Sequence, residues 1–236
     1  MWRAVLALML AAAPAAGETI AAARYEALTT RYGHGAVAGG EWAELVLVFE
    51  SGAERRFGLP DDMVFEDVAP RLADLTGDGV AEAVVVESQI AQGARLAIWG
   101  TEGRIAAGPF IGTPHRWLAP LGAIDLDGDG RLEFAYVLRP HLDAVLTVVR
   151  FDGQGFEVVA EAPGLPSHAY RSGLLEGGVL DCGDWSMLLT ADLGWQRVMG
   201  TTWTEGRLET LALRPYDGPQ SFDAAAAWYG CPLIAP

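Results

Sequence analysis

Nine residues in the middle of the chain place oxygen side chains at a spacing that suits a divalent cation. Asp125, Asp127 and Asp129 alternate along the sequence, and Glu133 follows four residues after the last of them. Carboxylates that face one another repel strongly unless a positive charge lies between them. Glycines on both sides of Asp129 let the backbone curl around one centre at low steric cost. Because Ca²⁺ accepts six to eight oxygen ligands in an irregular geometry, the segment predicts a structural calcium loop.

A second loop repeats this pattern, with oxygen side chains at its first, third, fifth and ninth positions. The seventh position of each loop offers only its backbone carbonyl, as a calcium loop of this spacing requires. The predicted ligands are Asp74, Thr76, Asp78, the carbonyl of Val80, and Glu82 in one loop, and Asp125, Asp127, Asp129, the carbonyl of Arg131, and Glu133 in the other. Thr76 replaces a carboxylate, so we expect the first loop to bind more weakly. The alternative for both loops is a solvated acidic turn.

Neither loop is an EF-hand. An EF-hand needs a bidentate Glu at position twelve and a helix on each side. Position twelve is Val85 in one loop and Tyr136 in the other, and the flanking segments are apolar and rich in β-branched residues. The loops therefore connect strands, and a calcium-sensor role is excluded.

Most of the chain consists of short apolar segments separated by turns that contain glycine, which is typical of β-strands. Strands are expected at residues 18–25, 41–49, 55–60, 83–86, 93–100, 104–107, 134–138, 144–151, 156–160, 186–190, 195–203 and 207–213, with a short helix at 223–229. Aligned on the strand after each loop, Glu44, Glu82, Glu133 and Met187 are spaced by 38, 51 and 54 residues. Each interval accommodates about four short strands, as in a propeller blade. A β-sandwich is the alternative.

The two loops and their flanking strands resemble the calcium loops of FG-GAP and VCBS-like repeats, which join the strands of integrin-type β-propeller blades. With weaker copies the resemblance covers about residues 33–200. It implies an all-β fold, a small β-propeller of four or five blades with structural Ca²⁺. No Phe-Gly…Gly-Ala-Pro signature is present, and Asp181 and Asp184 do not keep the ligand spacing, so no calcium is expected there.

The first 17 residues have the pattern of a secretory signal peptide: Arg3, an apolar stretch of about ten residues, and small residues up to Gly17. We expect cleavage near Gly17, with Ala15 as the alternative, and a single domain over residues 18–236 in the periplasm or outside the cell. The formal net charge is −15, which disfavours nucleic acid and anionic membranes as partners. No second apolar stretch approaches the length that spans a bilayer. We expect a monomer.

Cys182 and Cys231 are the two cysteines. In an exported chain an even pair favours a disulfide over a metal or catalytic site. The alternative is two separately buried thiols.

Three of the four histidines lie in comparable linkers, each shortly before the first strand of a unit: His34, His115 and His168. If they converge, they could bind a transition metal or supply a general base. The alternative is that they are ordinary polar loop residues, since no metal-ligand spacing such as HxH or HExxH is present.

The sequence therefore predicts an exported calcium-binding repeat protein that acts as a binding or scaffolding module for a protein or glycan ligand. We do not expect an enzyme, because no nucleophile motif such as GxSxG is present. The alternatives are a hydrolase or lyase that acts on a polysaccharide, and a lectin-like carbohydrate binder that uses exposed Trp. Most of the tryptophans fall on or beside predicted strands, where packing is their more common use.

Overall fold

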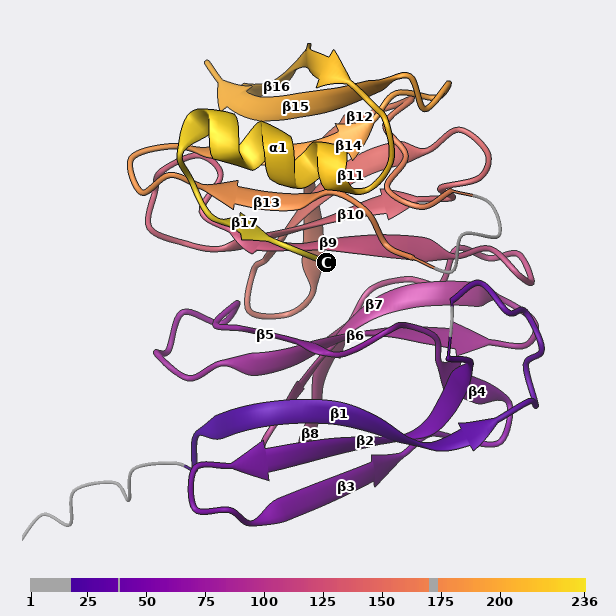
Figure 1. Cartoon of the computed structure of the whole chain (residues 1–236). Coiled ribbons are helices and arrows are strands. Elements are labelled where there is room, and N and C mark those ends of the chain that lie inside the picture. The colour runs from indigo at the N-terminus through magenta and orange to yellow at the C-terminus, as the bar shows by residue number, and fades with distance from the viewer. Residues whose placement is uncertain (1–17, 38, 170–173) are drawn as a thin grey trace, which may run out of the picture.

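The computed structural model describes residues 18–37, 39–169 and 174–236, and the predicted signal peptide at 1–17 lies outside these residues. The described chain is almost entirely β-structure, which confirms the all-β prediction (Figure 1). Its strands form three antiparallel sheets of eight, four and five strands, and the described residues also include one short helix. No helix of the described part is long and apolar enough to cross a bilayer.

The eight-stranded sheet contains the first half of the chain. Its strands are β1 (Ile20–Thr29), β2 (Glu41–Phe49), β3 (Glu54–Gly58), β4 (Met63–Phe65), β5 (Arg71–Ala73), β6 (Glu82–Gln89), β7 (Gly93–Gly100) and β8 (Gly103–Ala107). Strands β5 to β8 pair in chain order and form a four-stranded meander, whereas β1 and β3 flank β2.

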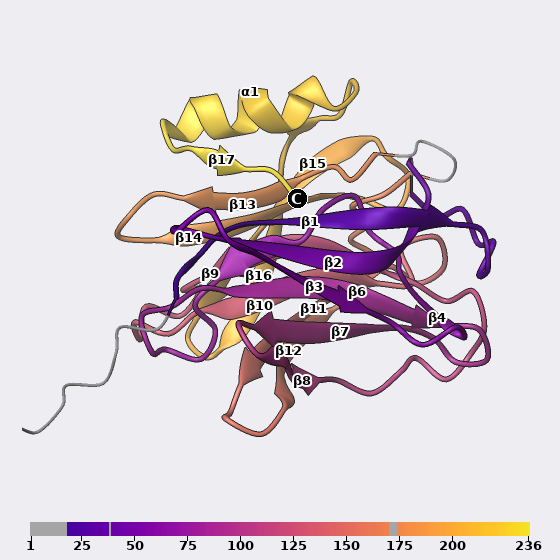
Figure 2. The same cartoon turned by 90° about the horizontal axis from the view of Figure 1, so that it is seen from below.

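The second half of the chain supplies two further meanders. The four-stranded sheet consists of β9 (Leu118–Ile124), β10 (Glu133–Leu138), β11 (Val145–Phe151) and β12 (Phe156–Ala162). The five-stranded sheet consists of β13 (Gly178–Asp181), β14 (Ser186–Ala191), β15 (Arg197–Thr204), β16 (Arg207–Pro215) and β17 (Leu233–Ile234). Helix α1 (Gln220–Tyr229) follows β16 and lies against this sheet (Figure 2).

Strand β4 joins the first two repeat units into one sheet. It pairs with β2 through Phe65 and Trp42, and all three of its residues pair with the last three residues of β6. Met63, Val64 and Phe65 are all buried, so this three-residue strand is apolar on both faces and packs between two longer strands. The boundary predicted between the first two blades is therefore not a boundary between sheets.

One large core cluster runs through all three sheets, because each sheet presents apolar side chains to the next. Its members include Val84 and Ile98 from the first sheet, Leu121 and Phe134 from the second, and Val179 and Leu188 from the third. A second cluster fills the first sheet around Phe65 and Trp99, and a third lies beneath α1 around Phe222. The sheets therefore hold the connecting loops in fixed places.

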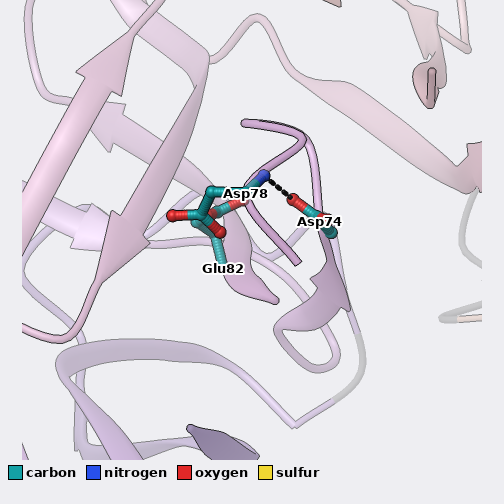
Figure 3. A group of neighbouring side chains, drawn as sticks. All are labelled: Asp74, Asp78 and Glu82. Carbon is teal, nitrogen blue, oxygen red and sulfur yellow. Dashed lines mark hydrogen bonds between the residues drawn. The ribbon is translucent and has the colours of Figure 1, made fainter. Parts of the chain in front are cut away.

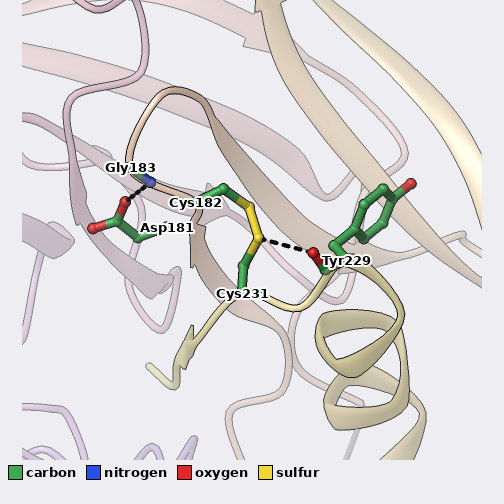
Figure 4. The surroundings of a disulfide bond; sticks show 5 residues. All are labelled: Asp181, Cys182, Gly183, Tyr229 and Cys231. Carbon is green, nitrogen blue, oxygen red and sulfur yellow. Dashed lines mark hydrogen bonds between the residues drawn. A yellow bond between two sulfur atoms is a disulfide. The ribbon is translucent and has the colours of Figure 1, made fainter.

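The disulfide between Cys182 and Cys231 is present, as the sequence predicts (Figure 4). It joins the turn after β13 to the segment that follows α1. That segment leaves the helix at Gly230, whose φ of 71° is the left-handed conformation that glycine adopts without strain. The chain then returns to pair β17 with β13. The bond thus fixes the C-terminal segment on the five-stranded sheet.

Candidate metal loops and a histidine cluster

A buried glutamate at the start of a strand holds each acidic loop by its backbone. Glu82 begins β6, and its Oε2 accepts the N–H of Leu75 at 3.0 Å. Glu133 begins β10, and its Oε2 accepts the N–H of Leu126 at 2.9 Å. In both loops the donor lies seven residues before the glutamate, so the same local fold recurs in two sheets.

The first unit has the same arrangement, although it lacks the acidic residues of the other two loops. Glu41 begins β2 with its side chain buried, and its Oε1 accepts the N–H of His34, seven residues earlier, at 2.7 Å. The prediction that Glu44 is the residue equivalent to Glu82 and Glu133 was therefore wrong. Glu44 lies farther along β2, and its carboxylate lies 3.6 Å from the Arg56 guanidinium. The spacing of apolar residues in the sequence did not show whether Glu41 or Glu44 is the equivalent residue. The hydrogen bond to the loop does.

The first acidic loop brings Asp74, Asp78 and Glu82 together, with one carboxylate oxygen of each within 4.8 Å of the others (Figure 3). Asp74 accepts the backbone N–H groups of Gly77, Asp78 and Gly79 at 2.7, 3.1 and 2.8 Å. These bonds curl the loop around its first carboxylate. The Thr76 hydroxyl donates to Glu82 Oε1 at 2.9 Å, so this predicted ligand also lies beside the group. Val80 donates its N–H to Asp78 at 2.8 Å.

The second acidic loop brings together Asp125, Asp127 and Glu133, again with their oxygens within 4.8 Å. Asp125 accepts the N–H groups of Gly128 at 2.8 Å and Asp129 at 3.1 Å. The Asp129 carboxylate, a predicted ligand, is not part of the close group: its Oδ1 accepts the N–H of Arg131, the other predicted position, at 2.9 Å. Three of the five predicted positions thus meet in this loop through their side chains.

Arg150 supplies a positive charge to the second loop, which the sequence analysis did not anticipate. Its Nη2 lies 2.8 Å from Asp127 Oδ2, its Nη1 lies 3.3 Å from Asp129 Oδ2, and its Nε donates to Glu133 Oε1 at 2.7 Å. On β11, Arg150 is the cross-strand partner of Glu133. The position of Arg150 beside the loop depends on the pairing register of β10 and β11, which the sequence pattern does not give.

In the described part of the chain, no arginine forms a salt bridge with Asp74, Asp78 or Glu82 of the first loop. Ala83 of β6 faces Trp99 of β7, so the position opposite Glu82 is Gly100. Glu82 is only 3% exposed, and it accepts hydrogen bonds from the neutral backbone N–H groups of Leu75 and Thr76 and from the Thr76 hydroxyl. The two loops therefore differ in charge balance: the second contains its own cation, and the first does not. The ranking of the two loops from sequence rested on the count of carboxylates and did not include this arginine.

Burial and the hydrogen bonds within each loop act in opposite directions on the pKa values of the two glutamates. Burial raises the pKa of Glu82, opposed by the hydrogen bonds from Thr76 and Leu75. Burial also raises the pKa of Glu133, opposed by the N–H of Leu126 and by Arg150. A divalent cation would favour the ionised form of both glutamates. The hard oxygen donors of both loops fit Ca²⁺, with Asp74, Asp78 and Glu82 in one loop and Asp125, Asp127 and Glu133 in the other as the groups that would hold it.

The four histidines of the chain gather in one place. The rings of His34 and His115 stack with centroids 5.1 Å apart, and those of His141 and His168 lie 4.8 Å apart. Partial burial, together with the neighbouring His168 and His34, lowers the pKa of His141 to about 4. The structure thus brings together the three histidines that the linkers single out, and it adds His141, which lies between β10 and β11.

Glu66 is the other member of this cluster that the sequence analysis missed. Its side chain is fully buried, and its Oε1 lies 2.6 Å from His34 Nδ1. It follows β4 directly, so the strand that joins two repeat units also carries this carboxylate. A buried Glu after an apolar triplet is a weak sequence signal by itself.

Comparison with known proteins gave no match to any family model, and no curated protein was found to match the chain.

Proposed function

We propose that the protein is an exported, calcium-stabilised repeat protein of the FG-GAP/VCBS type that acts as a binding module. The observation that carries the proposal is a cavity of about 500 Å³ with Asp125 and Asp127 in one wall. A cation in the second loop would fix that wall. The disulfide agrees with an oxidising compartment such as the periplasm or the cell exterior.

The repeat arrangement supports the family resemblance and a propeller-like arrangement of blades. Each of the segments β5–β8, β9–β12 and β13–β16 is a four-stranded antiparallel meander, the element from which propeller blades are built. Both acidic loops connect the first and second strands of their meander. In our proposal the strands β1–β3, which come first in the chain, form one further blade, so that the blades number four. Strand β4 joins this blade to the blade β5–β8.

The opposite wall of the cavity comes from the turn between β13 and β14, which the disulfide ties down. Trp185 and Trp203 line the cavity together with Asp181 and Asp184. Ser186 donates its hydroxyl to the backbone carbonyl of Asp125 at 3.0 Å, so the two walls are joined directly. Calcium in the loop would therefore order both walls of the ligand site.

A glycan is the ligand class that this lining favours. Indole faces stack on sugar rings, and carboxylates accept hydrogen bonds from sugar hydroxyls. Trp185 is 41% exposed and so presents part of its indole to a ligand. We therefore place a lectin-like binder ahead of a protein scaffold, and retain the polysaccharide-acting enzyme as the remaining alternative.

The test is a titration of neutral and acidic oligosaccharides into the protein with calcium and with EDTA, followed by tryptophan fluorescence and calorimetry. We expect saturable binding with calcium, weakened about fivefold or more by Trp185→Ala, since stacking contributes on the order of 1 kcal/mol or more. The matched control is Trp228→Ala, which removes an indole that is 85% exposed on α1 and outside this cavity. It should leave binding unchanged.

Each other outcome selects an alternative. Release of new reducing or unsaturated ends would replace binding by catalysis. Calcium-dependent capture of a purified periplasmic protein, without oligosaccharide binding, would favour scaffolding. Equal losses in the Trp185 and Trp228 variants would show that this cavity is not the ligand site.

A further inference from the structure

The histidine cluster encloses a second, smaller cavity of chemistry unlike that of the acidic loops. Its volume is about 180 Å³, and His34, His115 and His141 line it together with Trp117, Arg116 and Arg139. His168 lies behind His141, where it is 2% exposed and its Nδ1 lies 2.6 Å from the carbonyl of Leu174. The cavity thus gathers imidazole nitrogens from three separate connections: the loop after β1, the loop before β9 and the turn after β10.

His34 is held from two sides by buried carboxylates. Glu41 accepts the backbone N–H groups of Gly33, His34 and Gly35 at 2.9, 2.7 and 3.3 Å, which fixes the loop. Glu66 Oε1 lies 2.6 Å from the ring Nδ1, and because an ionised carboxylate can only accept a hydrogen bond, this contact places the proton on Nδ1. Nε2 is then the nitrogen with a free lone pair, as in metal sites where a carboxylate orients the ligating imidazole.

Glu66 is itself fixed on both sides. Ser88 donates its hydroxyl to Oε2 of the same carboxylate, and Trp117 donates its indole N–H to the Glu66 backbone carbonyl at 2.8 Å. A fully buried carboxylate is costly unless every oxygen is engaged. Here both oxygens are used, and one of them serves only to orient His34. A ring oriented in this way is a ligand with little rotational freedom to lose.

His115 and His141 are more exposed than His34. The backbone N–H of His115 donates to the Tyr32 hydroxyl at 3.0 Å, which anchors the backbone of this residue, and in the structure its ring stacks on His34. The nitrogens of the three rings do not form a group as tight as the acidic clusters, so binding requires rotation of these two rings. Arg139 Nε donates a hydrogen bond to Asp143 Oδ1 at 2.8 Å, and this carboxylate offsets part of the positive charge at the rim of the cavity.

We propose that His34, His115 and His141 bind a transition-metal ion of the Zn²⁺, Ni²⁺ or Cu²⁺ class. Imidazole suits these ions, whereas the oxygen ligands of the acidic loops suit Ca²⁺. The protein then carries two metal chemistries at separate places. Glu66 acts as a positioning residue for His34, and solvent completes the coordination.

The test is calorimetric titration of the metal-free protein with Zn²⁺ in saturating Ca²⁺, with Co²⁺ absorption as the spectroscopic probe of nitrogen ligands. We expect one Zn²⁺ per chain at micromolar concentration, and visible Co²⁺ bands that change when a histidine is removed. His34→Gln and His141→Gln should each weaken Zn²⁺ binding at least about tenfold. Glu66→Gln should weaken it by about 10–100-fold and alter the Co²⁺ spectrum, because the carboxylate that orients the His34 ring is lost.

Two controls separate loss of the histidine ligands from binding at the acidic loops and from unfolding. The Glu82→Gln/Glu133→Gln double variant removes a carboxylate from each acidic loop and should retain Zn²⁺ binding. Thermal unfolding of each histidine variant without Zn²⁺ separates lost ligands from lost folding. Zn²⁺ binding that survives His34→Gln and His141→Gln together, or that disappears in the acidic-loop variant, would overturn the proposal.

Discussion

Replacement of Arg150 by Gln tests how the second acidic loop balances its charge. Arg150 lies within 3.3 Å of Asp129 and closer to Asp127 and Glu133, so in the metal-free protein it is the positive charge among these carboxylates. Gln keeps much of the length of the side chain but removes the charge. The carboxylates then repel one another without compensation until a cation enters the loop.

The magnitude follows from burial. Breaking a buried ion pair by removing one partner costs about 3–5 kcal/mol. The side chain of Glu133 is 2% exposed and that of Arg150 is 21% exposed, so solvent reduces the expected loss to about 2–3 kcal/mol. For a domain of this size each kcal/mol shifts the melting temperature by about 2–4 °C, which gives a decrease of about 5–10 °C in EDTA.

Calcium should recover much of this loss, because the cation takes over the role of the guanidinium. If the loss in saturating Ca²⁺ is smaller by about 1.4 kcal/mol, linkage requires the variant to bind Ca²⁺ about tenfold more tightly. The assay is thermal unfolding in EDTA and across a calcium series. The matched control is Arg95→Gln, which weakens a partly buried pair with Glu87 away from both loops. Equal losses with and without calcium in the Arg150 variant would refute the charge-balance reasoning.

Two further predictions concern the disulfide and pH. Replacing Cys182 and Cys231 by Ser opens a loop of 49 residues and should lower the free energy of unfolding by about 4 kcal/mol on the chain-entropy model, measured by urea unfolding; a loss below about 1 kcal/mol would contradict it. Burial raises the pKa of Glu66, Glu82 and Glu133 above 4.5, so the folded state binds more protons than the unfolded state. The metal-free protein should therefore lose stability as pH rises from about 4.5 through the raised values, and calcium should flatten this slope; the opposite slope in urea titrations would contradict the burial argument.

The sequence predicted the β-strands and the acidic loops because both depend on local patterns. Alternating carboxylates and a buried Glu at the next strand are contiguous in the chain, and the structure brings Asp74, Asp78 and Glu82 together as that pattern suggests. The pairing of Cys182 with Cys231 followed from there being two cysteines.

Most of the features that the sequence missed depend on long-range pairing. Arg150 reaches Glu133 through strand register, and Glu66 reaches His34 across 32 residues. Strand β4 is only three residues long, too short for periodicity to reveal, yet it decides that two units share a sheet. The repeat frame at Glu41 depended on a hydrogen bond rather than on apolar spacing.

Calorimetric titration of the metal-free protein with Ca²⁺ tests the central claim most directly. The structure predicts two binding events in the native chain, one in each of the Glu82→Gln and Glu133→Gln variants, and none in the double variant. Each event should be accompanied by an upward shift in melting temperature. Absence of both heat and any melting-temperature shift at millimolar Ca²⁺ would contradict the claim that these loops are calcium sites.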